Sequence, residues 1–365
     1  MGRGRARAHV TSPRAPLSGG QLGAAGSRSH RVAGTLAQRD GVDVNRTLVG
    51  VDLGGTHLRA AVATGPTTHA VPVVRDTPAR DGPAAVLDAV AACATHAAGG
   101  ATIDGLAIGI PGPLDATTGV VHATPNLAGW HEVPAAQELA GRLGCPVAVH
   151  NDARLAGFAE WVAGAGRGTR HFIFITASTG VGGALVLDGE LYNGAGSAGE
   201  VGHTPVGPDM PPCNQGHPGC LEGSASGTGI AHAARQALDS GVRSSLSGAN
   251  PATLDARAVE EAALAGDELS IRLFADAGRV LGRAIGGLIN LLAPEVIAVG
   301  GGLISAGDLL FAPMRRAITE IAFEWPAAHC RVVEAGLGGD AGLVGAIAWA
   351  VRTFGDLDHT SAGPE

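Results

Sequence analysis

The alternation of apolar and polar positions along the chain predicts an α/β protein made of two similar halves. Strands of the first half are expected at 48–53, 57–64, 69–74, 106–110 and 146–150, with helices at 83–98, 134–143 and from Asn151 onward. Strands of the second half are expected at 171–177, 183–188, 296–299 and 331–334, with helices at 224–239, 252–265, 267–292, 306–322 and 341–353. Each half opens with a strand-turn-strand hairpin, so we expect two domains with a cleft between them.

Residues 1–46 differ from the rest of the chain. They contain eight Arg and two Asp and have no helical or strand periodicity, which predicts a disordered Arg-rich tail. A transit peptide or a nucleic-acid-binding arm would have a similar composition and is the less favoured alternative. We expect residues 47–155, completed by the helix 341–353, to form a small α/β domain and residues 156–340 to form a large α/β domain.

The body of the protein is acidic. Beyond residue 46 the sequence has 17 Arg against 31 acidic residues, which disfavours nucleic acid as a partner. No apolar run approaches the ~18 residues of a membrane span, so no membrane partner is expected. The five cysteines are odd in number and mostly scattered, which favours a reducing, cytoplasmic location over a disulfide framework.

Lysine is absent, and the 25 strongly basic side chains are all arginine. This excludes a Walker-A phosphate loop, the strand lysine of protein kinases and any Schiff-base enzyme. A nucleotide would therefore be bound here without lysine.

Both hairpin turns have the chemistry of phosphate sites. The first, Asp52-Leu53-Gly54-Gly55-Thr56, offers a carboxylate for Mg²⁺, two glycines whose N–H groups can approach a phosphate, and a hydroxyl. The second, 176–183, again combines hydroxyls with glycines and includes Thr179 and Gly180. An ordinary hairpin explains either turn alone, but the repetition indicates a phosphate chain held between two domains.

Two further turns follow strand ends. Gly300, Gly301 and Gly302 would let a flat nucleoside pass over bare backbone, or would form only a flexible turn. Asn151 and Asp152 lie where a strand meets a helix, and such residues are preferred helix N-caps. A phosphoryl-transfer enzyme also needs one carboxylate to receive the proton of the attacking hydroxyl, and Asp152 is well placed for that role.

The segment 199–222 is the richest in reactive side chains. His203, Cys213 and Cys220 have the loop-like spacing of a structural zinc site. Glu200 and Glu222, gathered beside the histidine, would suit a polyhydroxylated ligand. A polar surface loop with two adventitious thiols is the alternative.

In this segment the sequence resembles the ROK family of sugar kinases and sugar-responsive repressors, over essentially all of residues 47–353. The family signature, Glu-x-Gly-His followed by Cys-x-Cys-Gly-x-x-Gly-Cys-x-Glu, matches Glu200-Val201-Gly202-His203 and residues 213–222. Segments 109–113, 125–130 and 151–153 are also similar to the family. The resemblance implies a two-domain actin-like ATPase (ribonuclease H-like) fold with an inter-domain cleft, an α/β class.

The resemblance also implies the role of each site residue. Asp152 matches the general base for the sugar hydroxyl. Sugar-binding positions are matched by Asn126, Asn151, Glu200, His203 and Glu222. Positions that bind ATP with its Mg²⁺ are matched by Asp52, Gly54, Gly55, Thr56, Thr179, Gly180, Gly300, Gly301 and Gly302. In the family, one ring nitrogen of His203 would face zinc and the other the sugar.

The sequence departs from the family at two positions. Gln215 replaces the middle cysteine, so a zinc site of one histidine and three cysteines cannot form. Zinc would be held by His203, Cys213 and Cys220 with water or an amide oxygen, or His217 would substitute, or the site would be metal-free. His57 stands where relatives often carry lysine.

The function expected from the resemblance is ATP-dependent phosphorylation of a hexose, with glucose at its 6-hydroxyl favoured and a homodimer as the usual assembly. N-acetylmannosamine, N-acetylglucosamine and fructose are alternative acceptors, and polyphosphate is an alternative donor. A sugar-sensing repressor is disfavoured because residues 1–46 lack the periodicity of a helix-turn-helix module. A non-catalytic sugar-binding protein would bind sugar without hydrolysing ATP.

Overall fold

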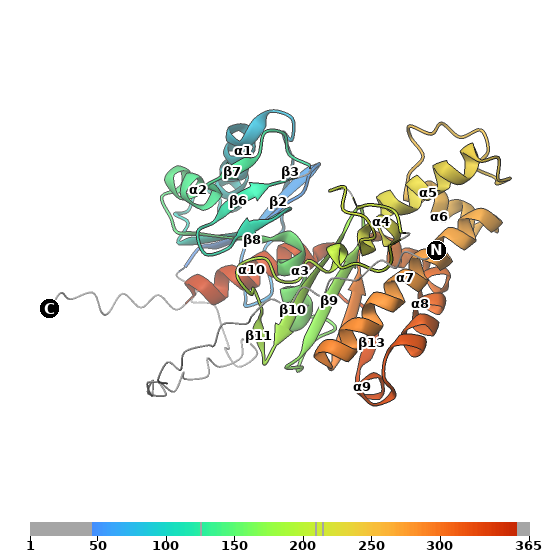
Figure 1. Ribbon diagram of the computed structural model, residues 1–365. Helices are drawn as coiled ribbons and strands as arrows, with labels where there is room; N and C mark the ends of the chain where they lie inside the picture. The colour runs from blue at the N-terminus through green and yellow to red at the C-terminus, as the bar shows by residue number, and fades with distance from the viewer. Residues whose placement is uncertain (1–45, 125, 209, 214, 356–365) are drawn as a thin grey trace, which may run out of the picture. The chain divides into compact units, whose positions relative to one another are not determined.

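The computed structural model describes residues 46–124, 126–208, 210–213 and 215–355 (Figure 1). The tail predicted for residues 1–46 lies outside the described residues except for Arg46. Within the described ranges, no helix is both long enough and apolar enough to cross a membrane.

A five-stranded sheet with the order β3-β2-β1-β4-β8 forms the first half. Its strands are β1 (Leu48–Leu53), β2 (His57–Val62), β3 (Val73–Asp76), β4 (Gly105–Ile110) and β8 (Val147–Asn151). β1 pairs antiparallel with β2, which places Asp52 opposite Arg59, and parallel with β4. Helices α1 (Gly82–Ala97) and α2 (Ala135–Leu143) pack on this sheet through an aliphatic core.

A second five-stranded sheet repeats this arrangement, with the order β11-β10-β9-β12-β13. Its strands are β9 (Phe172–Ala177), β10 (Val181–Leu187), β11 (Glu190–Leu191), β12 (Val296–Gly300) and β13 (Arg331–Glu334). Here too an antiparallel hairpin, β9 and β10, continues into parallel strands. The two hairpin turns therefore occupy equivalent positions in the two sheets.

The second half carries most of the helices. They are α3 (Asp152–Val162), α4 (Leu221–Ala225), α5 (Gly227–Asp239), α6 (Ala256–Leu264), α7 (Glu268–Leu292), α8 (Asp308–Ile321), α9 (Glu324–His329) and α10 (Ala341–Phe354). Helices α7 and α8 share a core with β9 and β12, and Phe158 of α3 packs with residues of the same strands in a separate core. Short 3₁₀ turns form at Val201–His203, Gly302–Ala306 and Gly338–Asp340.

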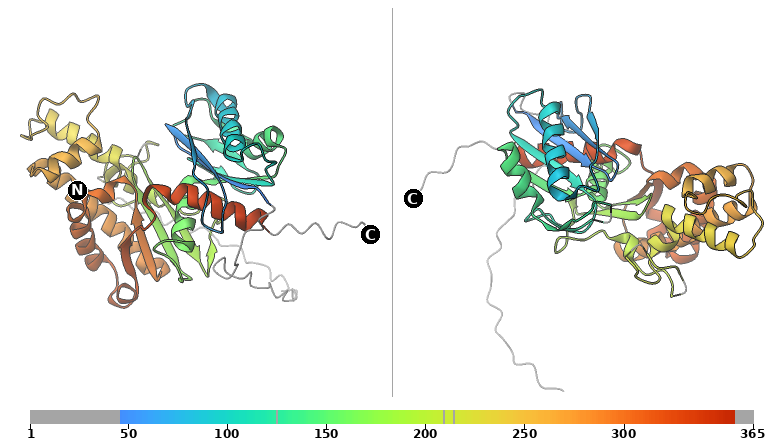
Figure 2. Two further views of the ribbon diagram at one scale, coloured as in Figure 1. Left: turned by 180° about the vertical axis from the view of Figure 1, so that it is seen from behind. Right: turned by 90° about the horizontal axis from the view of Figure 1, so that it is seen from above.

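The last helix, α10, packs against the first sheet although it ends the described chain (Figure 2). Leu343, Ile347 and Val351 share a core with Leu48 of β1. The helix crosses closely, because a Cβ atom on Gly50 would lie 2.6 Å from the backbone nitrogen of Ile347. Ala348 of the same helix joins the core of the second half, so α10 contributes to both.

The structure corrects several predicted boundaries. The strand expected at 69–74 begins only at Val73, because Pro72 has no N–H to donate to a ladder. The helix expected at 224–239 is two helices separated at Ser226, whose side chain caps the second. β10 begins at Val181 rather than 183, and the helix expected at 252–265 begins after its N-cap Asp255.

A small third sheet was not predicted. It consists of β5 (Leu114–Asp115), β6 (Val120–Ala123) and β7 (His131–Val133). Strands of two to four residues are too short for an alternating pattern to reveal.

Candidate active site

A cavity of about 940 Å³ brings together residues from both sheets. Most of the predicted site residues line it: Asp52, Asn126, Asn151, Asp152, Thr179, Gly180, Glu200, His203, Glu222, Gly300, Gly301 and Gly302. Gly54, Gly55, Thr56, Cys213 and Cys220 are not among its lining residues. The cavity therefore joins the predicted nucleotide and sugar positions in one space.

Asp152 is the first residue of α3 and faces this cavity. Burial raises its pKa to about 6, and the negative charges of Asp52 and Glu200 act in the same direction. One of its oxygens accepts a hydrogen bond from the N–H of Ala153 at 2.8 Å. A carboxylate with a pKa close to neutral is suited to accept a proton.

Asn151, its neighbour, is the N-cap of α3. Its Oδ1 accepts from the N–H of Arg154 at 3.1 Å, and its Nδ2 donates to the carbonyl of Gly112 at 3.2 Å. The capping role weighed in the sequence is thus the one that the structure gives to Asn151. Because the cap is Asn151, the Asp152 side chain is not needed for it.

Asp52 is paired with an arginine that the sequence analysis did not single out. Its Oδ2 accepts from Nη2 of Arg59 at 2.6 Å and from Nε at 3.2 Å. Arg59 also donates to the carbonyl of Gly339 at 2.6 Å and lines the cavity. It was missed because the alternation of β2 marks position 59 only as a polar residue of a hairpin strand.

The first turn is closed by its own backbone. The N–H of Gly54 donates to the carbonyl of His57 at 2.9 Å, so this N–H is not directed at the cavity. A Cβ atom on Gly55 would lie 3.0 Å from Cβ of Asn126, which places this turn against a predicted sugar-binding residue. The side chain of His57 is exposed and pairs with Asp76 at 3.1 Å, away from the residues that line the cavity.

The second turn contacts a residue predicted to bind the sugar. Glu222 is buried, and its Oε2 accepts from the N–H of Val181 at 3.1 Å. A Cβ atom on Gly180 would lie 2.6 Å from the same oxygen. Gly301 has φ +92° and packs against the backbone of Ala177, which a side chain would prevent.

Glu160, also missed from the sequence, lines the cavity and binds the backbone at residues 336–337. It is fully buried, and its two oxygens accept from the N–H groups of Gly336 at 3.0 Å and Leu337 at 2.7 Å. The same α3 helix therefore carries Asp152 at its start and fixes the segment that leads to Gly339 near its end. Glu160 lies on a helix, eight residues after Asp152, and this position gives no sequence signal for its role.

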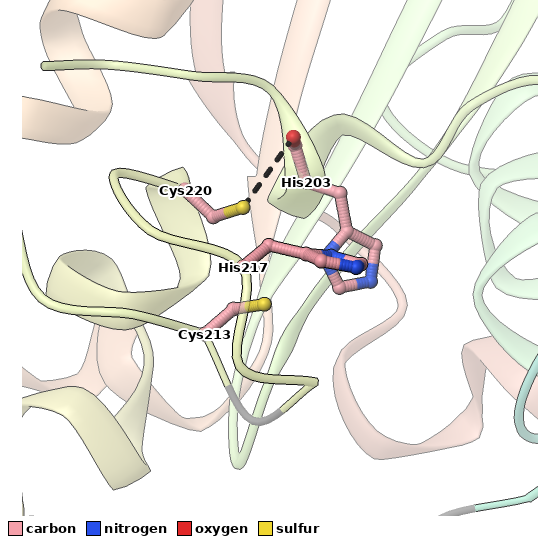
Figure 3. A group of neighbouring side chains, drawn as sticks. All are labelled: His203, Cys213, His217 and Cys220. Atoms are coloured by element: carbon pink, nitrogen blue, oxygen red, sulfur yellow. Dashed lines mark hydrogen bonds between the residues drawn. The ribbon is translucent and has the colours of Figure 1, made fainter. Parts of the chain in front are cut away.

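Four potential metal ligands come together beside the cavity (Figure 3). One ligand atom from each of His203, Cys213, His217 and Cys220 lies within 4.8 Å of the others. Nδ1 of His203 is buried and has no hydrogen-bond partner within the described residues. Of the alternatives left open by Gln215, this geometry favours His217 as the substitute ligand.

The chain is similar to known proteins over most of its length. A model of the ROK family matches residues 48–353. The chain is 35% identical over 303 residues to a glucokinase from Thermotoga maritima, which covers 82% of this chain and 95% of the relative. It is 33% identical over 311 residues to a glucokinase from Streptomyces coelicolor, with 82% and 95% covered.

A solved structure agrees with these matches. The crystal structure of a ROK family glucokinase from Streptomyces griseus in complex with glucose and AMPPNP is similar with a TM-score of 0.71 and 32% identity, covering 84% of this chain and 99% of that chain. The expected α/β class and two-domain actin-like ATPase fold are thereby confirmed. On the family match and these identities, the chain belongs to the ROK family.

Proposed function

We propose that this protein is an ATP-dependent hexose kinase that phosphorylates glucose at its 6-hydroxyl. One observation carries the proposal: Asp152 lies in a cavity that it shares with the glycine turn at 300–302 and with three polar sugar-site residues, Glu200, His203 and Glu222. Relatives named glucokinase, similar over most of their length, support glucose as the acceptor.

The chemistry requires one proton acceptor and a fixed geometry. Asp152 receives the proton of the sugar hydroxyl while that oxygen attacks the terminal phosphorus of ATP. The bond from this phosphorus to the bridging oxygen breaks, and ADP leaves with the electron pair. Because such transfer depends mainly on positioning and charge neutralisation, the polar residues around Asp152 act by orienting the hydroxyl.

Neutralisation of the phosphate charge is assigned to Arg59 and to Mg²⁺, which Asp52 would hold. Mg²⁺ is usually held by one or two carboxylates together with water and substrate phosphates, and the Asp52 carboxylate, with a side chain 21% exposed, fits that requirement. Mg²⁺ would supply positive charge to the phosphates. Among the described residues that line the cavity, Arg59 is the only arginine, so we assign it as the protein's own cation for the nucleotide.

Zinc is assigned to His203, Cys213, His217 and Cys220. Two thiols and two imidazoles are a usual ligand set for structural zinc, and the orphaned Nδ1 of His203 fits a site that holds a metal. Zinc would supply rigidity to the segment that carries His203 and leads to Glu222. The histidine would then be fixed with its ring toward the sugar.

The acceptor is a neutral sugar. Asp152, Glu200 and Glu222 line the cavity together with Asn126 and other polar groups, and their charges would repel an acidic sugar. N-acetylated hexosamines and fructose remain the alternative acceptors, and polyphosphate the alternative donor. A homodimer is expected by the same family resemblance.

An ADP-release assay with a panel of sugars and donors tests the proposal. We expect turnover with ATP and glucose, and we expect Asp152→Ala to abolish turnover while calorimetry still detects glucose binding. Sugar binding without ADP release by the unaltered protein would instead indicate a non-catalytic sugar-binding protein. Full turnover by Asp152→Ala would remove Asp152 from the mechanism.

A further inference from the structure

Arg154 is a buried cation behind the sugar half of the cavity. It lies in the first turn of α3, two residues after Asp152, and its side chain is 1% exposed. Its Nη1 donates to the carbonyl of Gly196 at 2.6 Å. Its Nη2 lies 3.6 Å from Oε1 of Glu200 and has no hydrogen-bond partner within the described residues.

Among the described residues, the Arg154 guanidinium has too few hydrogen-bond acceptors for its donors. Burial lowers the pKa of Arg154, and the charge of Glu200 opposes that shift. Because a buried charge is stable only when it is paired and hydrogen-bonded, the unpaired Nη2 favours any movement that brings an acceptor closer. Glu200 is the carboxylate that pairs with it, and the Glu200 side chain lines the cavity and is 39% exposed.

The segment that precedes Glu200 is built of turns, in which the N–H groups of Gly196 and Ala198 donate to the carbonyl of Asn193. Gly194, Gly196 and Gly199 all have positive φ angles, and the segment precedes Glu200 without a regular helix or strand. Arg154 contacts it twice, at the carbonyl of Gly196 and at the carboxylate of Glu200. Arg154, fixed on α3, therefore contacts both the segment that precedes Glu200 and the Glu200 carboxylate.

We propose that Arg154 is a positioning residue for the sugar acceptor. With sugar bound, Nη2 donates to one oxygen of Glu200 and leaves the other oxygen to accept hydrogen bonds from sugar hydroxyls. Arg154 does not line the cavity, so it acts through Glu200 and not by touching the sugar. The inference rests on the proposed hexose kinase function and deepens its sugar site.

Steady-state kinetics of Arg154→Met and Arg154→Lys test this role. We expect Arg154→Met to raise the KM for glucose about tenfold or more and to leave the KM for ATP within about twofold. Lysine keeps the charge but has no planar pair of donors, so Arg154→Lys is expected to fall between the parent and Arg154→Met. In a double-mutant cycle, Arg154→Met should add little to Glu200→Ala, because both changes remove the same contact.

Arg235→Met is the matched control. Nη1 of Arg235 donates to the carbonyl of Leu254 at 2.7 Å, and Arg235 does not line the cavity. It should lower the midpoint of thermal unfolding without changing either KM beyond about twofold. Thermal unfolding of every variant shows whether lost stability, and not lost positioning, explains a kinetic change.

Different results would overturn the positioning role of Arg154 and the proposed hexose kinase function on which it rests. Glucose KM values within about twofold of the parent for both Arg154 variants would overturn the positioning role, as would an equal rise of both KM values. If Arg154→Met does not fold, Arg154→Lys decides by the same criterion. An unaltered protein that neither binds glucose nor releases ADP would overturn the proposed function itself.

Discussion

The carboxyl group of Asp152 is subject to two opposing requirements. It must be ionised to accept a proton, yet burial and the charges of Asp52 and Glu200 disfavour ionisation and raise its pKa to about 6. The raised pKa makes it a stronger base near neutral pH. Its ionised form, however, is less stable in the folded protein than in the unfolded chain.

The first prediction is the pH dependence of catalysis. Because Asp152 must be deprotonated, kcat/KM for glucose should fall tenfold per pH unit below about pH 6 and level off above it. A pH series of initial rates in a buffer of constant ionic strength measures this limb. An acid limb centred near the ordinary carboxyl pKa of about 4 would contradict the assigned environment.

The second prediction concerns stability. The folded-state pKa of Asp152 is raised, so the folded protein binds more protons than the unfolded chain between about pH 4 and pH 6, and stability falls as pH rises through that window. Asp152→Asn removes this penalty and should stabilise the protein at pH 7 by up to about 3 kcal/mol. Urea unfolding at pH 5 and pH 7 measures it.

Asp308→Asn serves as the control for this measurement. The Asp308 side chain is 85% exposed, so its replacement should change the free energy of unfolding by no more than about 0.5 kcal/mol. An Asp152→Asn variant no more stable than the parent at pH 7 would show that the cavity solvates the carboxylate.

The elements that the sequence predicted well are strands with long, uninterrupted runs of apolar residues. The apolar runs of β1, β4, β9 and β12 are buried on both faces, and continuous apolar runs are typical of such strands. The hairpin turns and the Asp152 position followed from turn chemistry at strand ends. The strand expected at 69–74 was predicted with the wrong bounds, since β3 is Val73–Asp76. The β5 to β7 sheet was missed, because very short strands carry little local signal.

Site residues that act across long sequence separations were the hardest to predict. Arg59 meets Gly339 and Glu160 meets Leu337, and only the folded chain brings these pairs together. His217 was considered as a substitute for the family cysteine that Gln215 replaces, and its ligand atom lies within 4.8 Å of that of Cys213. The cytoplasmic location and the two domain ranges stay predictions.

The third prediction concerns the segment 203–220 as a metal-stabilised element. The purified protein should contain about one zinc ion per chain, and His217→Ala should lower both the zinc content and the midpoint of thermal unfolding. Removal of zinc with a chelator should raise the KM for glucose, because His203 loses its fixed orientation.

His329→Ala is the control for the zinc measurement, since His329 packs on exposed Trp325 and not near the ligand cluster. Elemental analysis that finds no zinc in the unaltered protein would contradict the metal assignment. Undiminished zinc in His217→Ala would show that another group is the fourth ligand.

At the scale of the whole molecule, the absence of lysine leaves arginine as the strongly basic side chain that can bind phosphate in the cavity. The chain has 25 arginines, and in the part of the chain that the structure describes Arg59 is the only one that lines the cavity. Arg59 also joins β2 of the first half to Gly339, which precedes α10. Arg59 therefore links two distant parts of the chain at the cavity in which the phosphates are proposed to bind.

The fourth prediction tests this arginine. Arg59→Gln should raise the KM for ATP about tenfold or more and change the KM for glucose by less than about threefold. Arg59→Lys should recover part of the loss because it restores the charge. Arg142→Gln is the control: Arg142 pairs with Asp88 at 2.7 Å and does not line the cavity. An unchanged KM for ATP in Arg59→Gln would remove Arg59 from nucleotide binding.

The packing of α10 on β1 has a consequence for biosynthesis. Strands β1, β2 and β4 leave the ribosome early, but Leu343, Ile347 and Val351, which cover one face of them, are among the last residues to be made. The nascent first sheet therefore presents bare apolar surface throughout synthesis of the second half, a period in which chaperones can bind it. A premature stop before residue 341 would leave this surface uncovered for the lifetime of the product.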